Sequence, residues 1–267
     1  MIRNEHVFRD VDGSGVAPAL ALYLEAVAAR PEVRALHDRA VALLAPRPGE
    51  RMLEVGCGLG ADARELAAMV APGEVVATDL STAMLTSARE RHDPALPVTY
   101  EHADVTDLPY EDASFDVVRV ERVLQHVADV ERACAEMARV LRPGGRLLAV
   151  DTDWGSFALD LAERDLVERC LAHAYRRFVS PRAALGLRRH LVGAGLADVS
   201  IEPFAFCYTS VGEAATLVPM VNDGIPAEAD FVPAADREAW FAALRAADAA
   251  GTFTVGWTAY LAVAHKR

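Results

Sequence analysis

Three glycines at alternate positions, Gly56, Gly58 and Gly60, constrain the fold of this chain more than any other feature. They follow a short apolar run at residues 52–55 and precede residues 61–71, where apolar residues recur at helical spacing. The apolar run is typical of a buried parallel strand, and glycines let the chain turn sharply and let a ligand approach bare backbone. A strand, a glycine turn and a helix in this order predict the opening of a nucleotide-binding α/β unit.

The residues around the glycines narrow the choice of nucleotide. The loop lacks the Lys and the Ser or Thr with which a P-loop holds phosphates. Glu54 precedes the glycines and Asp62 follows them, and a loop rimmed by carboxylates disfavours a pyrophosphate and suits a positively charged ligand. S-adenosylmethionine, which carries a sulfonium and an ammonium, meets this condition. A nicotinamide dinucleotide remains an alternative, because the loop also passes as a loose dinucleotide fingerprint.

Four further strands are expected downstream, alternating with helices, at residues 73–79, 98–104, 115–120 and 146–150. This alternation predicts a doubly wound, mostly parallel sheet, whose ligand lies beyond the carboxyl ends of the strands. Acidic residues fall at these ends. They are Glu54, Asp79, Asp104, Glu121 and Asp151.

Two of these carboxylates have specific predicted contacts with a nucleoside. Asp79 stands about 20 residues after the glycines, where an acidic side chain accepts hydrogen bonds from a ribose diol; capping of the next helix is the alternative. Asp104 could accept from the adenine amino group while Val105 packs against the ring, or serve only as a turn carboxylate. Leu80 and Met84 are placed to flank a flat base, and a role in the core is nearly as good an interpretation.

The rest of the chain is predicted to surround this unit. Residues 1–47 form a helical arm, which either packs on the sheet or closes as a lid, with Phe8 and Tyr23 shutting an apolar pocket. Residues 48–267 form the ligand-binding domain. Its last two strands are expected at residues 197–206 and 251–265, separated by a helical insertion at 211–250.

Composition excludes several classes of function. The net charge of −12 opposes binding to nucleic acid, so a small-molecule substrate is the better expectation. No long apolar segment or signal peptide is evident, which predicts a cytoplasmic protein without a membrane span, as a monomer or homodimer. No cluster has metal-ligand spacing, so no metal is expected. The four cysteines, expected to be buried apolar residues, are Cys57, Cys134, Cys170 and Cys207.

Over about residues 48–155, the chain resembles the class I S-adenosylmethionine-dependent methyltransferases, in the ubiquinone/menaquinone-biosynthesis-like branch that also modifies bacterial natural products. The resemblance is carried by Leu-Glu-Val-Gly-Cys-Gly-Leu-Gly, Ala-Thr-Asp-Leu-Ser-x-x-Met, Ala-Asp-Val, Ser-Phe-Asp-Val-Val, Val-Leu-Gln-His-Val and Arg-Val-Leu-Arg-Pro-Gly-Gly.

The resemblance implies a Rossmann-like sheet of seven strands, the last antiparallel, and S-adenosylmethionine as the cofactor, converted to S-adenosylhomocysteine. Carried over to this sequence, the methionine part of the cofactor would be lined by Glu54, Gly56, Cys57 and Gly58. Asp79 would hold the ribose, and Asp104 with Val105 would hold the adenine. Glu121 would lie near the sulfonium. Nothing in the resemblance identifies the acceptor.

Methyl transfer is an in-line displacement at a carbon that the sulfonium already activates, so a general base is needed only for a protonated nucleophile. The candidates for that base, or for orienting the acceptor, are His126, Glu121, Asp151, Asp153 and His6. His126 is as readily explained as a capping or core histidine. The predicted substrate contacts are Phe8, Tyr23, Asp151 and Trp154. A cofactor-bound fold that performs other chemistry, such as cyclisation, stays open.

Overall fold

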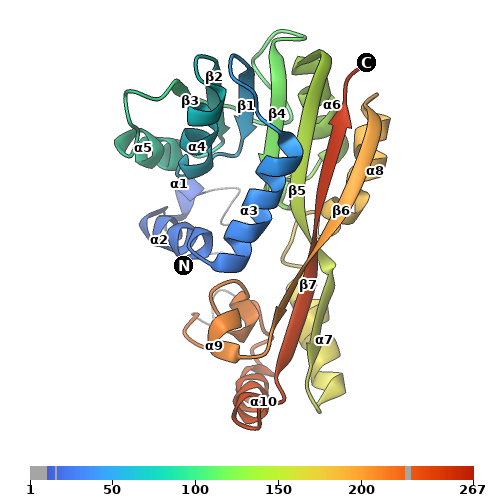
Figure 1. Ribbon diagram of the computed structural model, residues 1–267. Helices are drawn as coiled ribbons and strands as arrows, with labels where there is room; N and C mark the ends of the chain where they lie inside the picture. Colours follow the sequence, from blue (N-terminus) through green and yellow to red (C-terminus); the bar gives the residue numbers. More distant parts are fainter. Residues whose placement is uncertain (1–10, 16, 226–229) are drawn as a thin grey trace.

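The computed structural model describes residues 11–15, 17–225 and 230–267 of the chain. Its described residues form one twisted sheet of seven strands in the order β3-β2-β1-β4-β5-β7-β6 (Figure 1). The first five strands are parallel, and β7 runs antiparallel to both β5 and β6, which confirms the predicted doubly wound, mostly parallel sheet. The strands are β1 Arg51–Val55, β2 Glu74–Asp79, β3 Val98–His102, β4 Phe115–Glu121, β5 Leu141–Asp160, β6 Ala197–Tyr208 and β7 Thr254–His265.

Helices cover both faces of the sheet, as its nearly continuous apolar strands require. On one face, Leu36, Leu66 and Leu85 from three helices join a single core with strand residues such as Met52. On the other face, α6 and α8 pack on the sheet. The helices are α1 Val11–Ser14, α2 Ala17–Ala28, α3 Pro31–Leu44, α4 Ala61–Val70, α5 Thr82–Glu90, η1 Leu124–His126, α6 Val130–Val140, α7 Arg164–Tyr175, α8 Ala183–Gly193, α9 Val211–Ala214, η2 Pro219–Val221 and α10 Arg237–Ala249.

The fifth strand is the main departure from expectation. The sequence predicts that it ends at Val150, but β5 continues to Asp160. The extension persists because β7 stays paired with it beyond the parallel sheet, from Asp151 opposite Tyr260 to Asp160 opposite Thr254, across one bulge. The backbone groups of this segment are thus satisfied by an antiparallel partner. The next helix, α7, begins at Arg164.

The extended strands carry the C-terminal helices away from the main sheet. In Figure 1, α9 and α10 lie beside the lower halves of β6 and β7, on the side to which the parallel strands point. The predicted insertion at 211–250 is helical, but its described part consists of two short turns and one long helix, α10. In the described part of the chain, we find no helix with the length and apolar character needed to cross a membrane.

α1 and α2 lie toward the carboxyl ends of the parallel strands, whereas α3 packs across a face of the sheet (Figure 1). Asp12 of α1 ties this arm to the nucleotide-binding unit, because its carboxylate accepts hydrogen bonds from Ser81, Thr82 and Ala83 at the N-terminus of α5. The hydroxyls of Ser81 and Thr82 hold the pKa of Asp12 well below its usual range. An anion at a helix N-terminus is favourable, so this contact fixes the arm over the sheet edge.

Candidate active site

A cavity of about 860 Å³ opens at the carboxyl ends of the parallel strands and continues along the extended part of β5–β7. Its volume lies near the upper end of the range of about 300–1,000 Å³ for small-molecule pockets. Most of the predicted site residues line it. They are Tyr23, Glu54, Gly56, Cys57, Gly58, Asp79, Leu80, Met84, Asp104, Val105, Glu121, His126 and Trp154. Asp151 and Asp153 do not line it, and His6 and Phe8 lie outside the described residues.

The glycine loop forms the floor of this cavity, and two of its glycines have no room for a side chain. All three have positive φ, at 72°, 51° and 69°. A Cβ on Gly56 would lie 2.2 Å from Cγ2 of Val123, and one on Gly60 would lie 2.7 Å from the ring of Tyr100. A Cβ on Gly58 would meet only Leu24 of α2, at 3.7 Å, so the arm lies directly over the loop. The loop therefore presents bare backbone to the cavity.

Asp79 at the end of β2 is bound to the glycine loop. Its carboxylate accepts a hydrogen bond from the Gly58 N–H at 2.8 Å and another from the Ser81 N–H at 2.9 Å. Burial raises the pKa of this carboxyl above its ordinary value. The residue that caps α5 is Ser81, whose hydroxyl accepts from Met84 N–H, so the capping alternative for Asp79 is wrong.

The next part of the wall suits a flat apolar group. Leu80 is 45% exposed although it is a large aliphatic residue, and the surface that it exposes lies on the cavity. Met84 is buried in a small cluster with residues of α1 and α2. Asp104 accepts from the N–H and the hydroxyl of Thr106, both at 2.8 Å, and Val105 lies beside it on the wall.

A buried arginine, which sequence reasoning missed, organises the carboxylates at the opposite end of this wall. Arg119 of β4 is fully buried, and its guanidinium binds Glu54, Glu121 and, at 3.0 Å, Asp62. A charged residue within the apolar strand Phe-Asp-Val-Val-Arg-Val was the signal that could have revealed it, because a buried charge requires partners. Two of the acidic strand ends, Glu54 and Glu121, are therefore held in place by a cation from the core.

One guanidinium does not fully compensate three carboxylates, and the pKa values reflect this. Burial raises the pKa of Glu54 to about 8, against the opposing charge of Arg119. Oε2 of Glu54 is buried and has no hydrogen-bond partner among the described residues. Burial also disfavours the charged form of Asp62, but the hydrogen bond with His37 and the charge of Arg119 prevail and lower its pKa. An additional cation in the cavity would complete this network.

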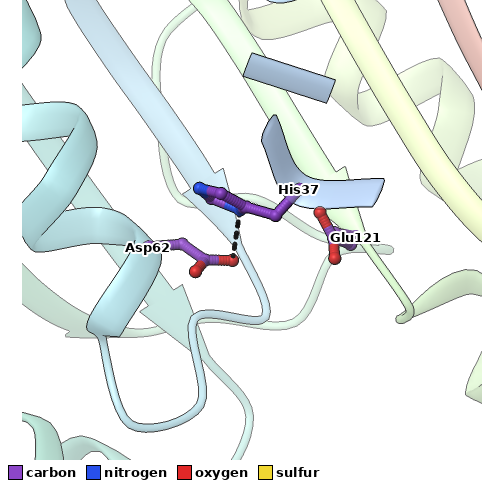
Figure 2. A group of neighbouring side chains, drawn as sticks. All are labelled: His37, Asp62 and Glu121. Carbon is purple, nitrogen blue, oxygen red and sulfur yellow. Dashed lines mark ion pairs between the residues drawn. The ribbon is translucent and has the colours of Figure 1, made fainter. Parts of the chain in front are cut away.

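His37, Asp62 and Glu121 come together from three different elements, as Figure 2 shows. Their potential ligand atoms lie within 4.8 Å of one another, close enough for a metal ion. Nη2 of Arg119, however, contacts all three side chains and fills the space among them. The cation of this cluster is thus the guanidinium.

The three candidate catalytic residues have different surroundings. His126 lies on the cavity wall in η1. Glu121 also lines the cavity, but its carboxylate is bound to Arg119. Asp153 is buried within the extended β5, where it accepts from the Gly155 N–H and faces Arg182.

Asp151 likewise supports the backbone rather than the wall. It accepts from the N–H groups of Gln125 and Thr152, and burial raises its pKa to about 7. Asp151 and Asp153, expected as a base or as a substrate contact, do not line the cavity. In β5, strand alternation turns Thr152 and Trp154 to the cavity and Asp151 and Asp153 to the other side.

The far wall of the cavity is aromatic, and apart from Tyr23 and Trp154 its members were not predicted. Trp154 stacks on Phe178 with ring centroids 4.2 Å apart. Trp257 stacks on Phe206 at 5.0 Å. All four line the cavity, and they come from β5, β6, β7 and the segment after α7. Sequence periodicity could not group them, because the bulge and the length of β5 decide which side chains meet.

Fold and site together define a Rossmann-like nucleotide-binding protein whose cavity is acidic at the strand ends and aromatic beyond them. Comparison with known proteins specifies the family. Residues 53–149 match the family model described as a methyltransferase domain. The chain is 35% identical over 253 residues to an uncharacterised 37.1 kDa protein of transposon TN4556 from Streptomyces fradiae, covering 91% of this chain and 70% of that protein.

It is also 36% identical over 141 residues to the demethylmenaquinone methyltransferase of Clavibacter sepedonicus, covering 53% of this chain and 57% of that enzyme. Among solved structures, the YcgJ protein of Bacillus subtilis superposes with a TM-score of 0.63 at 19% identity, covering 86% of this chain and 97% of that one. The chain belongs to the class I S-adenosylmethionine-dependent methyltransferases. This assignment favours S-adenosylmethionine over the nicotinamide alternative.

All four cysteines are free thiols. Cys134 and Cys170 are buried as expected, and Cys57 is half-buried in the glycine loop. Cys207 is exposed on β6, where a small apolar core residue was expected.

Proposed function

We propose that the protein transfers the methyl group of S-adenosylmethionine to a small-molecule acceptor and releases S-adenosylhomocysteine. The observation that carries this proposal is the convergence of Glu54, Asp79, Asp104 and Glu121 around the glycine loop in one cavity. Carboxylates favour the positive charges of the donor, and the same groups accept hydrogen bonds from its ribose and base.

In this proposal, the methionine part of the donor lies against Glu54, Gly56, Cys57 and Gly58. The unpartnered oxygen of Glu54 supports this placement, because a bound ammonium group would satisfy it. Glu121 lies near the sulfonium, where its bond to Arg119 fixes its position. The base lies between Leu80 and Met84.

Asp79 holds the ribose, and Asp104 with Val105 holds the adenine. The two N–H groups that bind Asp79 support this role, since they orient its carboxylate at the loop. Each of these contacts uses groups already fixed by the fold, so little ordering is needed on binding.

The protein's contribution to the chemistry is to position the acceptor and exclude water. We assign this to Tyr23 and Trp154, with residues 1–47 acting as a lid on the domain formed by residues 48–267. Leu24 of this arm lies 3.7 Å from the Cβ position of Gly58, which supports a lid over the donor. His126 is the candidate base or orienting group, since Glu121 is bound to Arg119 and Asp153 is off the wall. A cytoplasmic monomer or homodimer is expected.

Calorimetry with S-adenosylhomocysteine tests donor binding, with NADH as the competing ligand. The sharpest variant is Leu80→Ser, because Leu80 is exposed on the cavity wall and its replacement removes apolar contact without opening the core. The loss of about 1–1.5 kcal/mol of apolar burial corresponds to about tenfold weaker binding. Leu185→Ser on α8 is the matched control, at 46% exposure and away from the cavity. Binding of NADH but not of S-adenosylhomocysteine would disprove the proposal.

The nature of the product separates methyl transfer from other chemistry on the same fold. A methyltransferase adds the mass of one methylene unit to its acceptor and releases S-adenosylhomocysteine. A cyclase yields an isomer of unchanged mass and leaves the donor intact. Mass spectrometry of both components after incubation therefore decides between them.

A further inference from the structure

The cavity extends well beyond the region that an adenosyl donor occupies in the proposed function. Its far part is bounded by α2, by the extended halves of β5, β6 and β7, and by η2. Aromatic rings line this part, and their stacking continues through Phe178, Trp154, Phe157 and Trp257 to Phe206. The interplanar angles between successive rings are 9° to 30°, so the rings cover one another's faces and turn their edges to the cavity. A wall of ring edges is apolar and packs edge-to-face on a flat aromatic ligand.

We call the far part of the cavity, lined by Trp154, Phe178, Phe206 and Trp257, the aromatic chamber. It has room beside it for an apolar substituent. A second cavity of about 250 Å³ lies on the other side of the Trp154–Phe178 stack. The two cavities share Trp154, Phe178, Pro219 and Phe231 as walls. The chamber is therefore suited to planar conjugated molecules larger than a single ring.

Arg122 stands where the acidic donor end meets this aromatic chamber. It follows the last residue of β4, and its neighbour Val123 presses against Gly56 of the glycine loop. Its φ is +57°, a left-handed conformation that costs a residue with a side chain of order 1 kcal/mol. Two hydrogen bonds hold this backbone, from the Arg122 N–H to Val150 and from the Gln125 side chain to the Arg122 carbonyl.

The guanidinium of Arg122 is only weakly compensated. Its Nε is buried, forms no hydrogen bond within the described part of the chain, and lies 3.5 Å from Glu121, whose carboxylate already binds Arg119. By contrast, Arg177 elsewhere on the wall forms an ion pair with Asp230 at 3.3 Å.

Three further groups face Arg122 from neighbouring elements. Tyr23 of α2 is kept neutral by burial, which raises its pKa against the charge of Arg122. Asp151 of β5 is held by backbone N–H groups, and Asp62 of α4 is held by Arg119 and His37. Each thus has other partners, so an anion entering the chamber would find Arg122 as its counter-charge.

We propose that the acceptor is a planar conjugated molecule with an acidic hydroxyl group, a phenol or an enol, and that Arg122 binds its oxygen as the anion. This inference rests on the proposed methyl transfer and names the class of acceptor for it. The reaction is O-methylation. The hydroxyl proton passes through His126, the candidate base, to water. The oxygen forms a bond to the methyl carbon, and the carbon–sulfur bond breaks with its electron pair remaining on sulfur. The products are a methyl ether and neutral S-adenosylhomocysteine.

The probe is 7-hydroxy-4-methylcoumarin, whose phenolate absorbs at longer wavelength than its phenol. Titration of the probe in a complex with the protein and S-adenosylhomocysteine reports the pKa of the bound hydroxyl. It is expected to lie about one unit or more below its value in water, a tenfold shift in ionisation. Arg122→Met is expected to abolish the shift and Arg122→Lys to restore part of it. Arg189→Met, at an exposed position on α8, is the control for loss of one positive charge.

The companion probe 7-amino-4-methylcoumarin has the same shape but no acidic hydroxyl. It is expected to bind at least tenfold more weakly to the wild type and equally to wild type and Arg122→Met. Equal binding of both probes to the wild type would overturn the inference. So would failure of the hydroxycoumarin and of 1,8-dihydroxyanthraquinone to bind to a protein that still binds S-adenosylhomocysteine. If S-adenosylhomocysteine itself fails to bind, the proposed function falls, and with it this inference.

Discussion

Replacing Arg119 by Met is expected to destabilise the protein through the charges that it leaves behind. Methionine fills much of the volume of the arginine stem, so the main loss is the cation that binds Glu54, Glu121 and Asp62. Two of these carboxylates are less than 5% exposed as side chains, and removing one partner of a buried ion pair costs about 3–5 kcal/mol. With a urea m-value of about 3 kcal/mol/M, the unfolding midpoint falls by about 1–1.7 M.

Two controls separate this effect from the loss of packing. Arg169→Met removes an arginine that is 56% exposed and paired with Asp236, and a surface ion pair of this kind contributes at most about 1 kcal/mol. The double variant Arg119→Met/Glu54→Gln removes the most deeply buried excess charge together with the cation. It is expected to recover a substantial part of the lost stability, since a neutral amide needs no counter-ion.

The pH dependence of Arg119→Met supplies the decisive result. Without the guanidinium, the pKa of Glu54 rises further above that of the unfolded chain, so the folded state binds more protons. Stability then increases as the pH falls, and the deficit relative to wild type shrinks between pH 8 and pH 5.5. A cost below about 1 kcal/mol at pH 8, or a cost that stays constant down to pH 5.5, would refute the reasoning.

Three other outcomes are expected from the site. Gly56→Ala should lower the affinity for S-adenosylhomocysteine at least tenfold, because the added Cβ would meet Val123 at 2.2 Å. The control Gly195→Ala, at φ +84° with open space around it, should lower the free energy of unfolding by only about 1 kcal/mol and leave the affinity unchanged. The affinity of the wild type for S-adenosylhomocysteine, measured by calorimetry at pH 6, 7 and 8, should increase as the pH approaches about 8, because Glu54 ionises over this range. The affinity of Glu54→Gln should not change with pH over the same range. His126→Ala should lower kcat with the hydroxycoumarin at unchanged affinity for S-adenosylhomocysteine; an unaltered kcat would remove His126 from the chemistry.

The part of the cavity at the strand ends could be predicted from sequence because its geometry is local. The glycines, Asp79 and Asp104 each lie within a few residues of a strand end, and the parallel sheet brings such ends together whatever the rest of the chain does. The aromatic part of the cavity could not be predicted from sequence, because it depends on one long-range strand pairing. β7 holds β5 in strand geometry to Asp160, which turns Asp151 and Asp153 inward and places Trp154 beside Phe178.

In the proposed O-methylation, one cavity must accept a cationic donor and an anionic acceptor, and Arg119 and Arg122 at the end of β4 have separate roles in this. Arg119, Glu121 and Arg122 at the end of β4 carry a positive, a negative and a positive charge in turn. Arg119 points into the core beside Glu54, and Glu121, two residues further on the same face of the strand, binds Arg119. The left-handed turn at Arg122 then breaks the alternation and brings the second cation to the cavity wall, with Nε 3.5 Å from Glu121. A regular strand through residue 122 would not make this turn. In the O-methylation proposed above, this strained backbone would let a cationic donor and an anionic acceptor meet at the end of a single strand.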